Sequence, residues 1–246
     1  MKLPLLPSIL CLCVVALASC APKTPPAPST STTTIPAIQQ TSSGGMLERT
    51  SSSSKPLSIV QLETKAAAGD PHAAFDLATI YHDGKGAPID YAKAKTLFVQ
   101  AAKSGDPLAQ FNIGLMSYKA EGGTKNVKEA SSWFQKASKQ GNLRATSDLG
   151  LLAYNGEGQK VDYNKAFQLI QEAANGGYAQ AQFNLGVMYA KGQGVAIDLT
   201  QSYAWFLIAQ ANGNQRASTS IAIIKPQLTA DQVSQAESQA SAFKSE

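Results

Sequence analysis

The chain is poor in the residues that most enzyme and metal sites require. Its three cysteines all precede residue 21, so residues 21–246 hold no thiol for a disulfide, a cysteine zinc site or a cysteine nucleophile. The two histidines, His72 and His82, are ten residues apart, which does not place them side by side on one helix face as a pair of zinc ligands. No P-loop, His-Glu-x-x-His or Gly-x-Ser-x-Gly motif occurs. We therefore expect no enzyme activity, no cofactor and no metal site.

Charge is also scarce. Charged residues make up 15% of the 246 residues and the formal net charge is +4. Between residues 66 and 213, 13 lysines and arginines stand against 12 aspartates and glutamates, a difference of one. Because nucleic-acid binding relies on a clustered basic surface, we expect no nucleic-acid partner.

Long apolar runs are absent as well. The apolar run of residues 9–17 is shorter than the ~20 residues needed to span a bilayer and has the length of a signal-peptide core. The Leu-Ala-Ser-Cys sequence that ends at Cys20 resembles the lipobox of bacterial lipoproteins. The resemblance implies that residues 1–19 are a signal peptide, that Cys20 is the lipid-attachment site, and that acyl chains such as palmitate anchor the protein. In that family an aspartate after the cysteine retains the protein in the inner membrane, so Ala21 favours the outer membrane of a Gram-negative bacterium.

A plain cleavable signal peptide and a buried core segment are the alternatives for the first twenty residues. Residues 21–56 are rich in proline, serine and threonine and offer almost nothing to a core. We interpret residues 20–56 as the lipidated cysteine followed by a disordered tether.

The rest of the chain repeats every 36 residues without an insertion. Two columns of small residues mark the repeat: Gly69, Gly105, Gly141, Gly177 and Gly213, and Ala73, Ala109, Ala145, Ala181 and Ala217. A Gly-x-Gly pair, which is Ala120-x-Gly122 in the second unit, and an aspartate or asparagine also recur at fixed positions. A period of this length indicates stacked helix pairs, since one pair cannot bury its apolar stripe alone.

Each unit is expected to hold two helices. In the first unit, the apolar spacing predicts a helix over residues 71–83 that begins after the N-cap Asp70 and ends at the Gly-x-Gly pair. A second helix is expected to begin after Asp90. In later units the second helices are expected to begin with capping boxes at Asn126 and Asp198.

The two ends of the repeat array differ from its middle. Residues 57–68 predict an N-terminal capping helix, and residues 69–213 hold the four repeats. Residues 214–246 predict a degenerate fifth repeat, with a first helix over residues 214–224, and a polar C-terminal capping helix.

The Asn-Leu-Gly-Val-Met-Tyr sequence of residues 184–189, the following Gly-x-Gly pair and Trp205-Phe206 resemble the Sel-one-like repeat, a relative of the tetratricopeptide repeat. The resemblance covers residues 66–213. It implies an all-α fold, a right-handed superhelical α/α solenoid of four 36-residue helix-pair repeats with terminal capping helices. It also implies a concave groove lined by the first helix of each pair.

On the expected first helices, one polar residue per unit lies outside the predicted core stripe, with aromatic side chains beside it. The candidate partner-binding residues are Asp76, Asn112, Asp148, Asn184, Phe111, Tyr118 and Tyr154. Short polar side chains can hydrogen-bond an extended peptide, and aromatic side chains can anchor it. The alternative is a solvated helix face whose aromatic residues belong partly to the core.

These features predict a lipid-anchored repeat scaffold of the bacterial cell envelope that binds a protein or peptide partner through its concave groove. The scaffold would lie on the periplasmic or the surface side of the outer membrane. The alternative is an envelope accessory protein that binds glycan or peptidoglycan, or that modulates an envelope enzyme.

Overall fold

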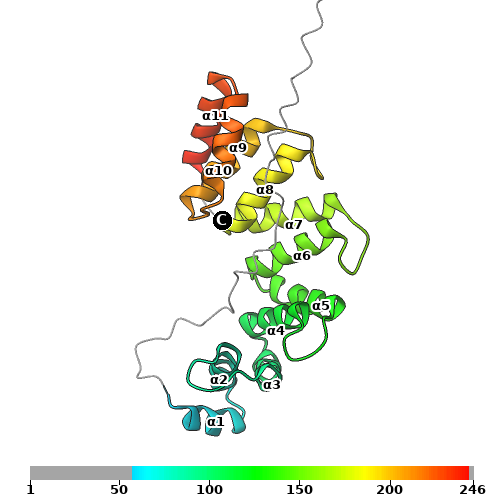
Figure 1. Ribbon diagram of the computed structural model, residues 1–246, viewed down its shortest axis with the longest axis vertical. Helices are drawn as coiled ribbons and strands as arrows, with labels where there is room; N and C mark the ends of the chain where they lie inside the picture. The colour runs from blue at the N-terminus through cyan, green and yellow to red at the C-terminus, as the bar shows by residue number, and fades with distance from the viewer. Residues whose placement is uncertain (1–56, 244–246) are drawn as a thin grey trace, which may run out of the picture. The chain divides into compact units, whose positions relative to one another are not determined.

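The computed structural model describes residues 57–243 of the protein, and this part of the chain consists of helices and short connections (Figure 1). The helices are α1 (Ile59–Ala67), α2 (Pro71–Asp83), α3 (Tyr91–Ala102), α4 (Pro107–Lys119), α5 (Val127–Ser138), α6 (Leu143–Asn155), α7 (Tyr163–Asn175), α8 (Ala179–Lys191), α9 (Leu199–Ala211), α10 (Ala217–Ile224), the 3₁₀ helix η1 (Lys225–Gln227) and α11 (Ala230–Ala242). The described residues contain no β-strand. The predicted signal peptide, Cys20 and the tether lie outside them.

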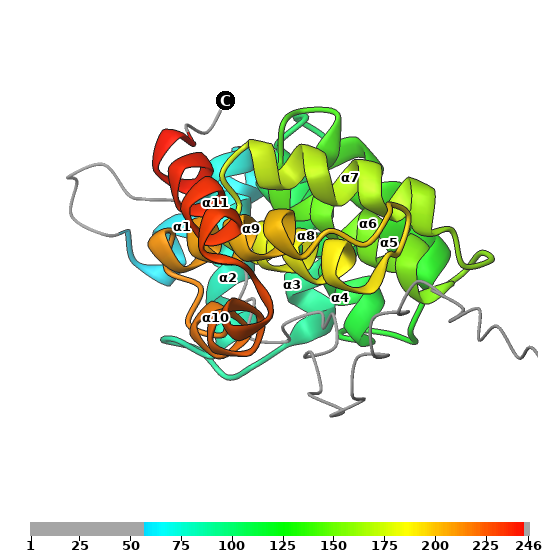
Figure 2. The same cartoon turned by 90° about the horizontal axis from the view of Figure 1, so that it is seen from above.

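Helices that follow one another in the chain pack against one another. The pairs α2–α3, α4–α5, α6–α7 and α8–α9 have the most extensive contacts, and each second helix also packs on the first helix of the next pair. At the C-terminal end both α10 and α11 pack on α9 (Figure 2). This order of contacts is that of an α/α solenoid, so the predicted all-helical repeat fold is confirmed.

In the first repeat, α2 begins and ends where the sequence predicts, and α3 begins where it predicts. Asp70 accepts hydrogen bonds from the backbone N–H groups of His72 and Ala73, and Pro71 occupies the first turn of α2. Asp90 caps α3 in the same way. The first helix of each repeat ends at a residue in the left-handed conformation: Gly84, Ala120, Gly156 and Gly192.

The two capping boxes expected within the repeats are only half formed. The side chains of Asn126 and Asp198 accept the expected backbone hydrogen bonds, but the return bond from the third helical residue is not made. The Glu129 carboxylate instead forms a 3.1 Å ion pair with the ammonium group of Lys95 in the preceding repeat. Reciprocal capping boxes are found at the array ends, where α1 and α11 begin.

The first helix of the fifth repeat begins later than predicted, at Ala217 rather than at residue 214. Asn214 forms a turn, because its side-chain oxygen accepts from the Arg216 N–H at 3.1 Å and its backbone oxygen accepts from the Ala217 N–H at 3.2 Å. The backbone N–H and C=O groups of Asn214 are therefore hydrogen-bonded in this turn, to Ala209 and Ala217, before the helix begins.

The core of the repeats joins small residues to large aromatic ones. The alanines Ala109, Ala145 and Ala181 are fully buried. In three repeats a phenylalanine of the first helix packs on one of the second helix: Phe75 on Phe98, Phe111 on Phe134 and Phe183 on Phe206, with ring centroids 5.3, 5.6 and 5.4 Å apart. Burial of each such side chain stabilises the fold by roughly 1.5–3 kcal/mol.

The second glycine of the Gly-x-Gly pair also joins consecutive repeats. Gly122 has φ +75°, and a Cβ added there would lie 2.6 Å from the backbone oxygen of Tyr91 in the preceding repeat. Gly194 repeats this arrangement against Tyr163, where an added Cβ would also lie 2.9 Å from Cβ of Phe167. Glycine is therefore required at these positions both for its backbone conformation and for close contact between repeats.

We expect Gly194→Ala to lower the free energy of unfolding far more than Gly141→Ala. Gly141 has φ +82° but nothing lies within 4 Å of an added Cβ, so alanine there costs only the left-handed conformation, about 1–2 kcal/mol. At Gly194 the overlap with Tyr163 adds roughly 1–3 kcal/mol. Urea unfolding of both variants measures the difference, with Gly123→Ala as the unstrained control. Equal losses at Gly194 and Gly141 would show that the inter-repeat contact is unimportant.

Candidate binding site on the first-helix face

The predicted polar column is present, but its members differ in exposure. Asp76 is exposed and Asp148 is partly exposed, whereas Asn112 and Asn184 are 0% exposed. The prediction that this stripe lies outside the core is therefore wrong for both asparagines. The reason is that α4 and α8 are enclosed by neighbouring helices: all nine residues from 109 to 117 of α4 are buried.

Phe111 is likewise not an exposed anchor. It is 1% exposed, and the Arg144 guanidinium from the next repeat lies over its ring at 5.1 Å. Its ring therefore forms part of the wall between α4 and α6, and any contact with a partner at this point would also involve Arg144.

A small cavity of about 20 Å³ lies on this wall. It is lined by Phe111, Leu115, Arg144, Ser147, Asp148, Leu151, Tyr178 and Gln180. These residues belong to the first helices α4, α6 and α8 or, for Tyr178, to the residue that precedes α8. The cavity thus brings together two of the predicted residues, Phe111 and Asp148, and its volume matches about one water-sized group.

Two departures from the repeat meet at this cavity. Ser147 stands where the other three repeats have Phe75, Phe111 and Phe183, so the ring that fills this position elsewhere is absent. Tyr178 is the N-cap of α8 and makes no side-chain capping bond, whereas the other three first helices of the repeats are capped by aspartate or asparagine. The loss of a cap costs about 1 kcal/mol, and such local costs are concentrated at functional sites.

Burial dominates the electrostatics of the cavity. Asp148 as a residue is partly exposed, but its carboxyl group is closely surrounded by protein atoms, which raises its pKa from the ordinary 3.8 to about 7. The positive charges of Arg144 and Lys119 act in the opposite direction and lower it. Burial also raises the pKa of Tyr178, whose hydroxyl oxygen is hydrogen-bonded by Arg144. Asp148 is thus about half protonated at neutral pH, and it lies beside a guanidinium group.

Sequence reasoning missed Arg144, Ser147 and Tyr178. The signal for Ser147 and Tyr178 was present in the repeat columns, because each interrupts a column that is otherwise phenylalanine or an N-capping residue. Arg144 carried no such signal, since its column already varies between His72, Leu108, Gln180 and Arg216.

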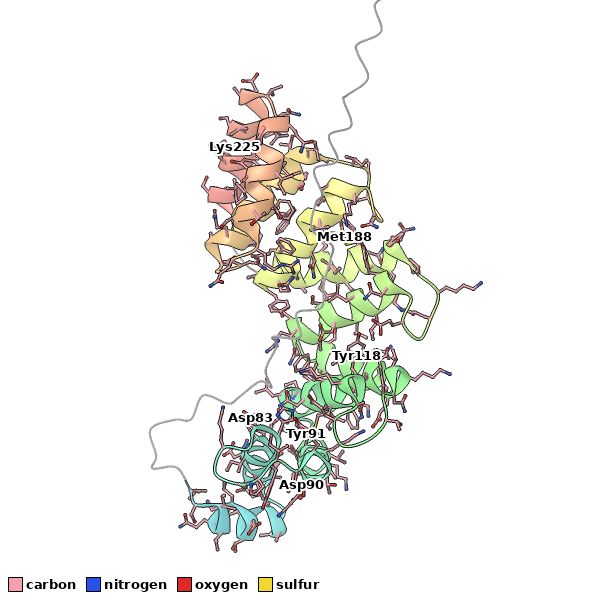
Figure 3. The ribbon with its side chains drawn as sticks, in the orientation of Figure 1. Asp83, Asp90, Tyr91, Tyr118, Met188 and Lys225 are labelled. Atoms are coloured by element: carbon pink, nitrogen blue, oxygen red, sulfur yellow. The ribbon has the colours of Figure 1, made fainter. Side chains whose placement is uncertain are left out.

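Tyr118 and Tyr154 lie away from the cavity, near the C-terminal ends of α4 and α6 (Tyr118 is labelled in Figure 3). The Tyr118 hydroxyl donates to Oε1 of Glu157 at 2.9 Å, and the Tyr154 hydroxyl donates to Oε1 of Gln193 at 2.5 Å. In both cases the acceptor is 39 residues later in the chain. Tyr118 therefore ties the second repeat to the third, and Tyr154 ties the third repeat to the fourth.

His82 occupies the same position in the first repeat and makes the same kind of tie. Its Nε2 lies 3.0 Å from Oε2 of Glu121, again 39 residues later, and its Nδ1 lies 2.7 Å from Oδ1 of Asp83. Burial alone would lower the pKa of His82, but the hydrogen bonds to Glu121 and Asp83 outweigh it, so the pKa is raised. Only the protonated ring can donate to both carboxylates.

Residues 57–243 contain neither a cluster of metal-ligating side chains nor a membrane-spanning helix. No group of three or more histidine, cysteine, aspartate or glutamate side chains there could hold a metal ion. In the same range no helix combines the length and the apolar character needed to cross a bilayer.

The sequence matches a family model of helical repeats over four consecutive segments, in agreement with the repeat fold described above. The family model described as Sel1 repeat matches residues 71–106, 107–142, 143–178 and 179–214. No curated protein matches the sequence significantly.

Several solved structures are similar. The structure of a Sel1 repeat protein from Oxalobacter formigenes is 28% identical over 76% of each chain, with a TM-score of 0.66. A protective antigen of uropathogenic Escherichia coli with an SLR fold is 25% identical over 75% of this chain and 55% of its own, with a TM-score of 0.38. A Sel1 repeat protein from Klebsiella pneumoniae is 20% identical over 68% of this chain and 83% of its own, with a TM-score of 0.45.

We expect His82 to make the stability of the first two repeats depend on pH. Because its pKa is higher in the folded than in the unfolded chain, its contribution is complete below about pH 6.5 and is lost as pH rises through the folded pKa. The lost hydrogen bond corresponds to about 1 kcal/mol. Thermal unfolding from pH 5.5 to 8.5 should show this loss in the wild type and a smaller one in His82→Gln. Identical pH profiles for the two proteins would contradict the role given to His82.

Proposed function

The chain belongs to the Sel1 repeat family, and on that premise we propose that it is a lipid-anchored scaffold that binds a protein partner through its first-helix face. Sel1 repeat proteins generally mediate protein–protein interactions and are typically non-catalytic. The proposal adds to this the surface used, the anchor and the bacterial cell envelope as the location.

The observation that carries the choice of surface is the cavity at Asp148. A cation, a carboxyl group of raised pKa and a phenol meet there, supplied by Arg144 and Asp148 on α6 and by Tyr178 directly before α8. Charged and aromatic side chains that converge on a small hollow are typical of protein-binding anchor points. Asn184, on α8, is the next member of the polar column after Asp148. Its side-chain nitrogen is buried without a hydrogen-bond partner among the described residues.

The anchor and the location rest on the sequence. An apolar run followed by Leu-Ala-Ser-Cys supports lipidation at Cys20, and stable anchoring then needs two or three acyl chains. The 36 residues from 21 to 56 would give the repeats a reach of up to roughly 110 Å from the membrane if fully extended. Such a reach suits a scaffold that meets its partner at some distance from the outer membrane.

We expect a photo-reactive phenylalanine analogue at Gln180 to cross-link to a discrete protein in intact cells. Gln180 lines the cavity, so a partner on the first-helix face would lie within reach of it. The same analogue at Lys103, which is exposed at the end of the second helix α3, is the matched control. The band should appear from Gln180 alone and should disappear when Asp148→Ala is added. Equal cross-linking from both positions would refute the choice of surface.

We expect Cys20→Ser to abolish lipidation. Cells fed a clickable palmitate analogue should label the wild-type protein and leave Cys20→Ser unlabelled, because the thiol of Cys20 is the proposed acceptor. Cys11→Ser and Cys13→Ser are the controls and should remain labelled, since both residues belong to the proposed signal peptide. Labelling of Cys20→Ser would contradict the lipoprotein proposal.

A further inference from the structure

Ser147 leaves an unmet hydrogen bond at the cavity. Its side chain is 1% exposed, and its hydroxyl oxygen has no hydrogen-bond partner within residues 57–243. A buried hydroxyl without a partner destabilises the folded chain, and a bound polar group would remove that cost. The phenylalanines at the same position in the other three repeats carry no such cost.

The charge around the cavity favours an anion. The charged and titratable groups that face Asp148 are Arg144 on the same helix, Lys119 at the end of α4 and Tyr178 before α8. Arg144 and Lys119 carry two positive charges, whereas Asp148 supplies at most one negative charge. An incoming ammonium group would meet a net positive charge here, and an incoming carboxylate would be attracted.

We propose that this cavity, lined by Arg144, Ser147, Asp148 and Tyr178, is a binding site for a single carboxylate group of the partner protein. The carboxylate belongs to an acidic side chain or to the C-terminus of the partner. The inference rests on the proposed protein-binding function of the first-helix face and names the chemistry that this face recognises. A cavity of about 20 Å³ admits one carboxylate oxygen, while the rest of the partner stays outside.

The lining residues supply hydrogen-bond donors for that oxygen. The guanidinium of Arg144 carries five N–H groups, of which one is donated to Tyr178, and its planar geometry suits carboxylates. Tyr178 accepts from Arg144 and keeps its own O–H as a donor. Ser147 contributes a further O–H, and Asp148 contributes one when it is protonated.

Asp148 makes the site sensitive to pH. When its carboxyl group is protonated it donates to the ligand, and when it is ionised it repels the ligand. Because the pKa of Asp148 is about 7, the protonated fraction falls from roughly 0.9 at pH 6 to roughly 0.1 at pH 8. The bound ligand and Asp148 are expected to hold one proton between their two carboxyl groups, so binding weakens as pH rises and that proton is lost.

The test uses three acetylated tripeptides as probes and the full chain as the protein. The probes are tri-alanine with a free C-terminal carboxylate, tri-alanine amide, and Ala-Glu-Ala amide. NMR titration should show binding of the first or the third probe, which separates a C-terminal from a side-chain source, and no binding of tri-alanine amide. The affinity of the bound probe should be about tenfold lower at pH 8 than at pH 6.

Two variants sharpen the result. Asp148→Asn keeps a neutral N–H donor at every pH, so its affinity should change less than twofold between pH 6 and pH 8. Asp76→Asn, the same substitution at the exposed member of the column, should retain the tenfold change. Ser147→Phe restores the residue of the other repeats and should abolish binding, with thermal unfolding as the check that the variant is folded.

The inference is wrong if none of the probes binds, if the amide probe binds as well as the acids, or if Asp148→Asn keeps the pH dependence of the wild type. Any of these results together with a Gln180 cross-link that depends on Asp148 would leave the proposed function standing and exclude only the carboxylate. Absence of the Gln180 cross-link in the wild-type protein would instead contradict the proposed protein-binding function, on which the inference rests.

Discussion

The close contact between consecutive repeats is the constraint on which the rest of the structure depends. No single helix pair encloses its own apolar stripe, so each pair is stable only where the next one covers it. The backbone contacts of Gly122 with Tyr91 and of Gly194 with Tyr163 span 31 residues in each case. An insertion between the two residues of either contact would move the glycine away from the backbone that it touches, so the length of chain between them is constrained.

Polar side chains also hold this register. The ties from His82, Tyr118 and Tyr154 each reach 39 residues ahead, into the next repeat. Each tie is directional, so together they oppose sliding of one repeat on the next in a way that apolar burial does not. The hydroxyl groups of Tyr118 and Tyr154, two residues predicted to bind a partner, are therefore already hydrogen-bonded between repeats.

The parts of the structure that depend on local chemistry could be predicted from the sequence. The bounds of α2, its cap at Asp70 and its end at Gly84 follow from residue types at fixed spacing. The burial of Asn112 and Asn184 could not be predicted in the same way. A helix-wheel argument assigns one face of a helix to solvent, but α4 and α8 have neighbours on almost all sides, and enclosure is decided by helices far along the chain.

In this repeat protein, a position at which one repeat departs from the residue type of the others tells more about function than a position at which all repeats agree. A residue that recurs in every unit is explained by the contact that every unit makes, as the phenylalanines that pack on the second helices show. Ser147 and Tyr178 each give up such a contact, one an aromatic pair and the other a helix cap, and both border the same cavity. Two independent losses of stability at one place are not required by the fold, because the other repeats do without them. We interpret them as the cost of the binding surface proposed above, because local losses of stability are expected where a protein binds a partner.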